Sequence, residues 1–189
     1  NASSRYIDEG TIISTDPPYY DNIGYADLSD FFYVWLRKTL QPANLSFFET
    51  MAVPKNEELV ATPARHGGKE KAYTFFMEGM KSFAIRVAKC SDPIPSTIYY
   101  AFKQSETFEE GVVSQGWASF LEAFVTSGIT IAGTWPVRTE LSNRMRGQNA
   151  NALASSVVLV CRKRPEEAPM ATRKEFVQAL QRELPASLE

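Results

Sequence analysis

Two long stretches of the chain repeat apolar residues at three- and four-residue intervals, the spacing of one helix face. The first predicts a helix over about residues 27–40, with Asp27 as its N-cap and Pro42 as the residue that ends it. Its apolar face consists of Leu28, Phe31, Phe32, Trp35 and Leu36. The second predicts a helix over about residues 69–89. Its apolar face, expected to lie in the core, consists of Ala72, Phe75, Phe76, Met80, Phe83, Ala84 and Val87.

Two shorter helices are predicted nearer the C-terminus. The apolar face of the third consists of Trp117, Phe120, Leu121 and Phe124. We expect Gly128 to end this helix, because glycine adopts the left-handed conformation of a helix C-terminus at low cost. The fourth follows a proline-containing linker at 165–169 and begins at a capping box formed by Thr172 and Glu175. It is expected to dock on the sheet, on another domain or on a second copy.

Four apolar or β-branched runs predict strands at about residues 11–15, 96–102, 129–135 and 155–161. The last run is continuously apolar, which is typical of a strand that is buried on both faces. Apart from the first and last helices, the elements follow one another in the order strand, helix, strand, helix, strand, strand. This order favours an α/β fold with three layers.

The composition permits one domain with a real core, since the chain has 189 residues and 44% of them are hydrophobic. The two cysteines, Cys90 and Cys161, lack the spacing of a metal site, so we expect no metal, no disulfide and a reduced, cytoplasmic setting. No apolar run approaches the roughly 20 residues of a membrane span, so no membrane partner is expected. The net charge of −2 leaves any nucleic-acid binding to local basic patches.

Residues Asp16-Pro17-Pro18-Tyr19 follow the first predicted strand and open a polar loop. A signature of Asp, Asn or Ser, then Pro-Pro, then an aromatic residue marks the amino-methyltransferases, and these four residues match it in full. The chain is further similar to a subgroup known as adenine-specific DNA methylases at 14–23 and 25–32, at 59–62 and 65–69, at 134–136 with Glu140, and at 154–156. The resemblance covers roughly residues 12–164.

These enzymes move a methyl group from S-adenosylmethionine to the exocyclic amine of adenine or cytosine. The resemblance therefore implies S-adenosylmethionine as the cofactor and DNA as the partner, with the target adenine flipped out of the duplex. It also implies a Rossmann-like methyltransferase fold. This chain would hold the second half of that sheet, which ends in an antiparallel hairpin around a long loop.

The chemistry explains the residue types of the signature. An aromatic amine is a poor nucleophile, because its lone pair is delocalised into the ring. The Asp16 carboxylate and the Pro17 carbonyl are natural acceptors for its hydrogens, which lets the nitrogen pyramidalise toward the methyl donor. Pro18 has no backbone N–H and has a fixed φ, so the Pro17 carbonyl can be aimed. Tyr19 is expected to stack on the base.

Other positions are candidates for the surrounding pocket and for phosphate contacts. They are Tyr20, Asn22, Trp135, Arg138 and Arg144. The loop at 41–68, which is rich in proline and glycine, has two open interpretations: a target-recognition segment or an ordered surface excursion. The only histidine, His66, lies in this loop, and we expect it to be structural or at the surface.

Two features of the complete enzymes are missing from the sequence. These enzymes carry a Phe-x-Gly-x-Gly turn after the first strand and an acidic residue after the second; neither is found, so no cofactor-binding residue is assigned. We expect residues 1–164 to be the catalytic half of a methyltransferase domain and 165–189 to be a linker and helix. The open sheet edge at 11–15 would be covered by the missing N-terminal half, by a partner chain, by self-association or by the terminal helix. A catalytically silent assembly module and an RNA amino-methyltransferase remain alternatives.

Overall fold

The computed structural model describes residues 8, 11–21, 23–43, 46–103, 115–137 and 153–188. Its described part is a mixed α/β structure of four strands and five α-helices. The strands are β1 (Ser14–Thr15), β2 (Ser96–Lys103), β3 (Ile129–Val137) and β4 (Leu153–Lys163). The α-helices are α1 (Tyr25–Leu40), α2 (Pro63–His66), α3 (Lys69–Cys90), α4 (Gln115–Thr126) and α5 (Arg173–Leu188). The short 3-10 helices are η1 (Gln41–Ala43) and η2 (Ser46–Phe48).

The four strands form one sheet in the order β1-β2-β4-β3. β1 runs parallel to β2, whereas β4 runs antiparallel to both β2 and β3. The predicted first strand is shorter than expected, because only Ser14 and Thr15 pair with β2. The Ile13 carbonyl still accepts a hydrogen bond of 2.9 Å from the Thr97 amide, so the chain stays beside β2 just before β1. The other three strands lie where the sequence predicts them.

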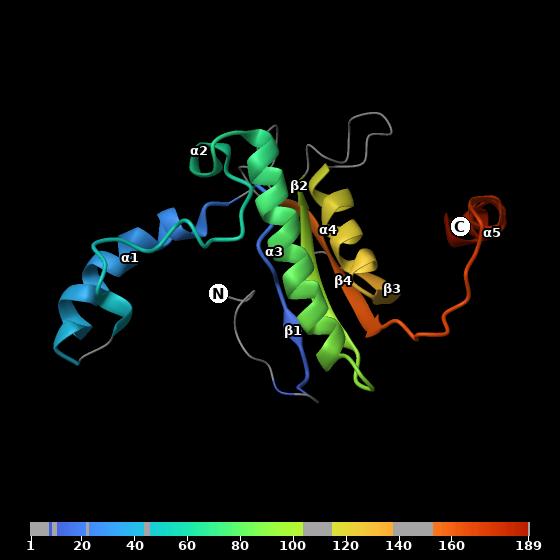
Figure 1. The fold of residues 1–189 in the computed structure, drawn as a ribbon, viewed down its shortest axis with the longest axis horizontal. Coiled ribbons are helices and arrows are strands. Elements are labelled where there is room, and N and C mark those ends of the chain that lie inside the picture. The colour runs from blue at the N-terminus through green and yellow to red at the C-terminus, as the bar shows by residue number, and fades with distance from the viewer. Residues whose placement is uncertain are drawn as a thin grey trace.

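Helices α3 and α4 pack side by side on one face of the sheet (Figure 1). The core between these helices and the sheet is mainly apolar, and its largest fully buried side chains include Tyr100, Phe76, Phe120, Phe124 and Met80. The middle of β2 alternates accordingly, since Ile98 and Tyr100 are buried and Tyr99 between them is 39% exposed. The described residues therefore form two layers, and the expected three-layer arrangement is not found in them.

The same asymmetry corrects the prediction that the last strand is buried on both faces. In β4, Leu159 and Cys161 are fully buried under the helices, but Val158 and Val160 are only half-buried. A continuous apolar run shows that both faces of a strand can be covered, but not that both are. Here the described helices cover only one face.

Helix ends follow local chemistry. Gly128 has a φ of 84° immediately after α4, in the left-handed region predicted for it, and its carbonyl accepts a hydrogen bond of 2.8 Å from the Arg164 amide. Before α5, the Thr172 amide donates to the Glu175 carboxylate at 2.6 Å and the Glu175 amide donates to the Thr172 hydroxyl at 3.3 Å. The predicted capping box is confirmed.

Helix α1 begins earlier than predicted. The Gly24 carbonyl accepts the amides of Asp27 and Leu28 at 3.1 and 3.2 Å, so the helix starts at Tyr25. Asp27 lies in the first turn, and its prediction as the N-cap is wrong. Together with the described residues that follow it, up to residue 58, α1 extends away from the sheet as an arm (Figure 1), called the α1 arm below.

Candidate functional site

The predicted signature lies where the first strand ends. Asp16 follows Thr15, the last residue of β1, so it stands at the carboxyl end of the parallel pair β1–β2. In open α/β sheets, this end of parallel strands is where ligands usually bind. A cavity of about 450 Å³ opens there. It is lined by Thr15, Asp16, Pro17, Pro18, Tyr25, Glu57, Glu58, Leu59, Met80 and Phe83.

Asp16 is held by the tyrosine of its own signature. The Tyr19 hydroxyl donates a hydrogen bond of 2.7 Å to Asp16 Oδ1. Burial, followed by the hydrogen bond to Asp16, raises the pKa of Tyr19 well above its ordinary value, so the hydroxyl keeps its proton and stays a donor. This contact holds one oxygen of a carboxylate that lines the cavity.

The ring of Tyr19 is part of the core. Its exposed fraction is 7%, and it packs edge-on against Tyr100 with ring centroids 5.3 Å apart. Tyr19 is also absent from the lining of the cavity. The geometry therefore gives Tyr19 the role of positioning Asp16, whereas stacking on a base would require its ring to leave the core.

The two prolines form one wall of the cavity. Pro17 is buried and Pro18 is half-buried, and both line the cavity beside Asp16. Neither has an amide hydrogen, so this wall offers carbonyl acceptors but no backbone donors from these two residues. Such a wall suits a ligand that donates hydrogen bonds.

Three polar groups from the α1 arm complete the rim. Tyr25 is the first residue of α1, and Glu57 and Glu58 belong to the segment that returns from the arm to the body. The Tyr25 pKa is raised by burial, then by the charges of Asp16 and Glu58, so its hydroxyl stays protonated near neutral pH. The rim therefore combines three carboxyl groups with one hydroxyl donor.

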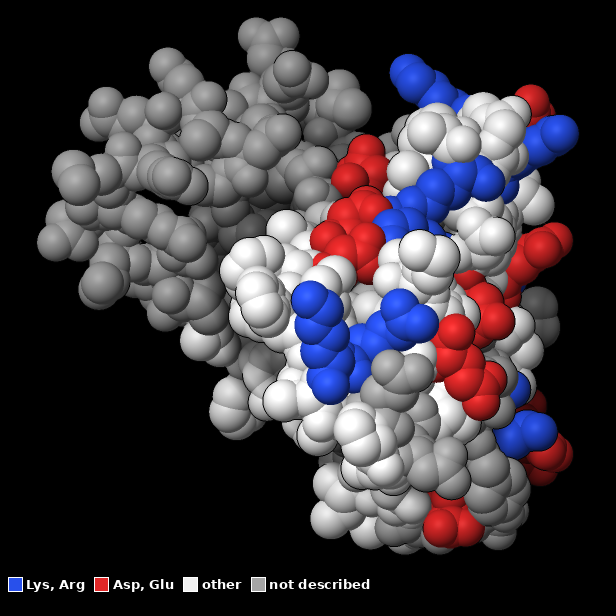
Figure 2. All heavy atoms as spheres, turned by 90° about the vertical axis from the view of Figure 1, so that its left-hand side faces the viewer, with Lys and Arg blue, Asp and Glu red and all other residues white. Residues whose placement is uncertain are grey.

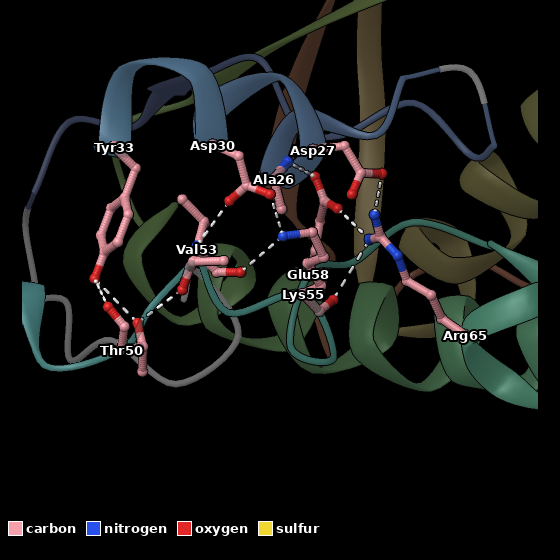
Figure 3. A network of polar contacts seen from close by, with 10 residues as sticks. Ala26, Asp27, Asp30, Tyr33, Thr50, Val53, Lys55, Glu58 and Arg65 are labelled. Carbon is pink, nitrogen blue, oxygen red and sulfur yellow. Dashed lines mark hydrogen bonds and ion pairs between the residues drawn. The ribbon is translucent and has the colours of Figure 1, made fainter. Parts of the chain in front are cut away.

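Glu58 is held rigidly (Figure 3). Its Oε1 accepts the Ala26 amide at 2.8 Å, and its Oε2 pairs with Arg65 Nη1 at 2.5 Å. Arg65 also pairs with Asp27 in the first turn of α1. These contacts connect α1, the returning segment and α2, and so fix the edge of the cavity that lies on the arm.

The floor of the cavity is apolar and comes from α3. Met80 is fully buried and Phe83 is 6% exposed, and Leu59 lies over the helix beside them. Leu59 comes so close because α3 carries Gly79 there, where an added Cβ would collide with the Leu59 side chain. An apolar floor with a polar rim is the usual form of a small-molecule site.

The structure does not bring all the predicted site residues together. Tyr20 packs against Phe76 and lines a second cavity of about 490 Å³, with Asp21 and Tyr73. Trp135 is 68% exposed on β3, at the opposite edge of the sheet from β1 and about 14 Å away by strand spacing. The predicted residues Asn22, Arg138 and Arg144 lie outside the described residues.

Sequence reasoning missed Tyr25, Glu57 and Glu58. A usable signal existed for the glutamates, because the loop at 41–68 was unusually long and was one candidate for target recognition. The described part of this loop is ordered against α1, and its end enters the body, where Val60 and Ala61 are 2% and 3% exposed. His66 in the same loop stacks on Phe75 at 4.0 Å between ring centroids.

Charged side chains of both signs are mixed on one face of the molecule. On the face shown in Figure 2, Lys and Arg side chains lie among Asp and Glu side chains rather than in one basic area. The carboxyl groups of the cavity are not arranged as a metal site, since no group of three His, Cys, Asp or Glu suited to a metal occurs in the described ranges. Within those ranges, none of the helices is long and apolar enough to cross a membrane.

Comparisons of the chain with protein-family models, with curated proteins and with solved structures found no match.

Proposed function

We propose that this chain carries the target-base half of an S-adenosylmethionine-dependent DNA methyltransferase, which transfers a methyl group to the exocyclic N6 amine of a flipped adenine. The observation that carries this proposal is the position of Asp16 and Pro17 at the mouth of an apolar-floored cavity of about 450 Å³. The cavity lies within the range of about 300–1,000 Å³ that is usual for small-ligand sites. A planar base with a donating amine fits it chemically.

The strand order supports the same proposal. The parallel pair β1–β2 is followed by the antiparallel pair β4–β3. This is what the proposal expects for the second half of a methyltransferase sheet that ends in an antiparallel hairpin. The open sheet face opposite α3 and α4 would then be covered by the rest of such a domain.

The reaction requires an amine whose lone pair points at the methyl donor. Asp16 Oδ2 and the Pro17 carbonyl would each accept one hydrogen of the amine, while the Tyr19 hydroxyl holds Oδ1 at 2.7 Å. Hydrogen bonds of this kind draw the nitrogen out of conjugation and orient it. The cavity floor of Leu59, Met80 and Phe83 would exclude water from the ring of the base.

The charge of the cavity fits the proposed chemistry. The carboxylates of Asp16 and Glu57 add negative charge to the rim, whereas Arg65 balances the charge of Glu58. Negative charge there favours both a hydrogen-bond-donating amine and the positive sulfonium of S-adenosylmethionine. When bound, S-adenosylmethionine supplies the methyl group. The same carboxylates repel phosphate, so the base would enter alone while the DNA backbone stays outside, as base flipping requires.

The test measures tritium transfer from labelled S-adenosylmethionine to duplex DNA, RNA and free nucleosides by this chain together with the cofactor-binding half that the proposal requires. We expect label in DNA alone, and a loss of about 100- to 1,000-fold in Asp16→Ala because a positioned acceptor is removed. Asp92→Ala is the control, since Asp92 is an exposed carboxylate paired with Lys163 at 3.6 Å, near the start of β2. Label in RNA or nucleosides, or equal transfer by Asp16→Ala, would contradict the proposal.

A second measurement separates the enzyme from a silent assembly module. A duplex with 2-aminopurine at the target position fluoresces more strongly when that base is unstacked. Asp16-dependent fluorescence without methyl transfer, even when the cofactor is saturating, would favour a binding module of the same fold. Fluorescence and transfer that depend together on Asp16 support the enzyme.

A further inference from the structure

Helix α1 turns its polar face toward the rest of the arm and its apolar face toward solvent. The face it turns toward the rest of the arm is largely polar, and the contacts there are mainly hydrogen bonds and ion pairs (Figure 3), beside the packing of the Tyr33 ring on Phe48. Asp30 pairs with Lys55 at 2.5 Å and accepts the Val53 amide at 2.8 Å, and the Tyr33 hydroxyl donates to the Thr50 carbonyl at 2.9 Å. These contacts hold the helix on the returning segment without using its apolar face.

The apolar face of α1 points to solvent. Its members, called the α1 stripe below, are Leu28 (63% exposed), Phe31 (69%), Phe32 (64%), Trp35 (62%) and Leu36 (47%). They lie on one side of the helix because they recur at three- and four-residue intervals. A contiguous exposed surface of two phenylalanines, a tryptophan and two leucines marks an interaction site rather than ordinary surface.

We infer that the α1 stripe is the contact of a symmetric dimer, in which α1 packs antiparallel against α1 of a second copy of this chain. The exposed parts of the five side chains amount to roughly 600 Å² per copy, given the area that large apolar residues usually offer. Two copies would bury about 1,200 Å², which reaches the lower end of stable specific interfaces. The stripe is therefore large enough to support self-association.

The charges of the helix favour its own antiparallel copy. Asp27 and Lys38 are about three helical turns apart, so they lie along the same edge of the stripe. A two-fold axis between Phe32 and Tyr33 would place Asp27 of each copy beside Lys38 of the other. Both groups are available, because the Asp27 side chain is 60% exposed even when paired with Arg65, and Lys38 is exposed above the Trp35 ring. Antiparallel helix dipoles add to this complementarity.

This inference is independent of the proposed function, since the α1 stripe faces solvent and none of its residues lines the cavity. Failure of either proposal would leave the other standing. Methyl transfer tests the cavity, and association tests the stripe.

Sedimentation equilibrium of the full chain over a range of concentrations tests the dimer. We expect a concentration-dependent dimer whose dissociation constant rises roughly 100-fold in Trp35→Glu, as for a central aromatic residue of an interface. Trp135→Glu is the matched control, because Trp135 is similarly exposed, at 68%, but lies on β3. A chain that stays monomeric at every concentration, or a dimer that Trp35→Glu does not weaken, would overturn the inference and assign the stripe to a different partner.

Two milder variants test the geometry without removing a large apolar side chain from the centre. Lys38→Glu should weaken the dimer by about threefold, an effect that fades at high salt, because it sets like charges opposite Asp27. Lys174→Glu on α5 should have no effect. A Lys38→Glu dimer as tight as that of the wild type would refute the antiparallel register.

Cysteine cross-linking fixes the direction of packing. The Phe32→Cys variant carries its cysteine next to the proposed two-fold axis and should form an intermolecular disulfide. The Thr39→Cys variant should not, because residue 39 of one copy lies about 20 Å from residue 39 of the other in the antiparallel arrangement. A parallel pair would cross-link at both positions. The native thiols do not interfere, because Cys90 and Cys161 are 3% and 0% exposed. Cross-linking at Thr39→Cys, or none at Phe32→Cys in a sample that is dimeric, would contradict the arrangement.

Discussion

Helices α1 and α3 are built on the same pattern but have opposite environments. Both repeat large apolar residues along one face, and both were predicted from that repeat alone. In α3 the repeating residues are buried against α4 and the sheet, and Phe76, Met80 and Val87 are 0% exposed. In α1 the equivalent residues are 47–69% exposed, and the polar face makes the contacts.

A hydrophobic repeat therefore identifies a helix and its apolar face, but not the part of the structure that buries this face. For α3 the cover lies within the chain. For α1 the arm is held by directional polar contacts, which can fix a helix in place without burying much apolar surface. Stability in these two regions should therefore respond to different substitutions.

The largest expected effect is the loss of a buried ring. Phe76→Ala in α3 should lower the free energy of unfolding by about 3–5 kcal/mol, because it removes apolar contacts and leaves a cavity. Phe31→Ala in α1 makes the same change at a side chain that is 69% exposed, and should alter the free energy of unfolding by less than about 0.5 kcal/mol. Urea unfolding followed by circular dichroism, at concentrations where the chain is monomeric, gives both values. Equal losses in the free energy of unfolding would show that the apolar face of α1 is covered within the monomer.

A smaller effect is expected from the polar contacts of the arm. Glu58→Gln keeps the shape of the side chain but removes the charge that Arg65 pairs with, and both side chains are nearly buried, at 11% and 13% exposure. We expect the arm to lose about 1–2 kcal/mol of local stability, because a charged hydrogen bond is weakened in a partly buried place. Faster amide hydrogen exchange in the first turns of α1 would report it, while exchange in α3 should not change.

The matched control for Glu58→Gln is Lys55→Met. Its ion pair with Asp30 is more exposed, with side chains at 28% and 33%, so solvent screens it and the exchange of α1 should change less. If amide exchange in α1 rose more in Lys55→Met than in Glu58→Gln, the buried Glu58–Arg65 pair would not be the contact that holds the arm.

The smallest effect concerns α5, which resembles α1 in leaving Phe176 59% exposed. The Glu175 pKa is lowered by hydrogen bonds from the amide and hydroxyl of Thr172, so the folded helix favours the carboxylate. This stabilisation is complete above the ordinary glutamate pKa of about 4.3 and is lost as pH falls through the lowered value. Amide exchange at the start of α5, corrected for its intrinsic pH dependence, should show less protection at acidic pH.

Thr172→Ser keeps the capping hydroxyl and should preserve this pH dependence, whereas Thr172→Ala removes the hydroxyl but keeps the amide that lowers the Glu175 pKa most, and should reduce it only in part. An α5 whose first turn is equally protected at acidic and neutral pH would show that the capping box does not control this helix end.

How well a feature of this molecule is predicted from the sequence depends on how far apart in the chain its interacting residues lie. The four longer helices, the strands, the glycine that ends α4 and the capping box of α5 depend on residues within a few positions of one another, and the sequence predicted them. The short helix α2 was not predicted, because it lies in the segment at 41–68 that was expected to be a loop. The N-cap of α1 was misplaced because Gly24, not Asp27, supplies the first accepting carbonyl. The third layer was inferred from element order, which does not specify the face on which a helix packs.

The candidate site divides in the same way. Asp16, Pro17 and Pro18 were predicted from a contiguous motif, and the structure places all three on one cavity. Trp135 was proposed for the same site, but three strand positions separate it from Asp16. Glu57 and Glu58 reach the cavity from about 40 residues away only because the arm folds back, a path that no local pattern specifies.

The sequence alone determined the order of the elements and the position of the Asp16 signature at the end of a strand, because backbone propensity, apolar periodicity and turn chemistry are local. Only the tertiary structure decided that the Tyr19 ring enters the core, that two distant glutamates join Asp16, and that the α1 stripe is left in solvent. The physical reason is that burial is a property of the whole arrangement. Whether a side chain is covered depends on elements far away in the chain, and its own sequence neighbours do not contain that information.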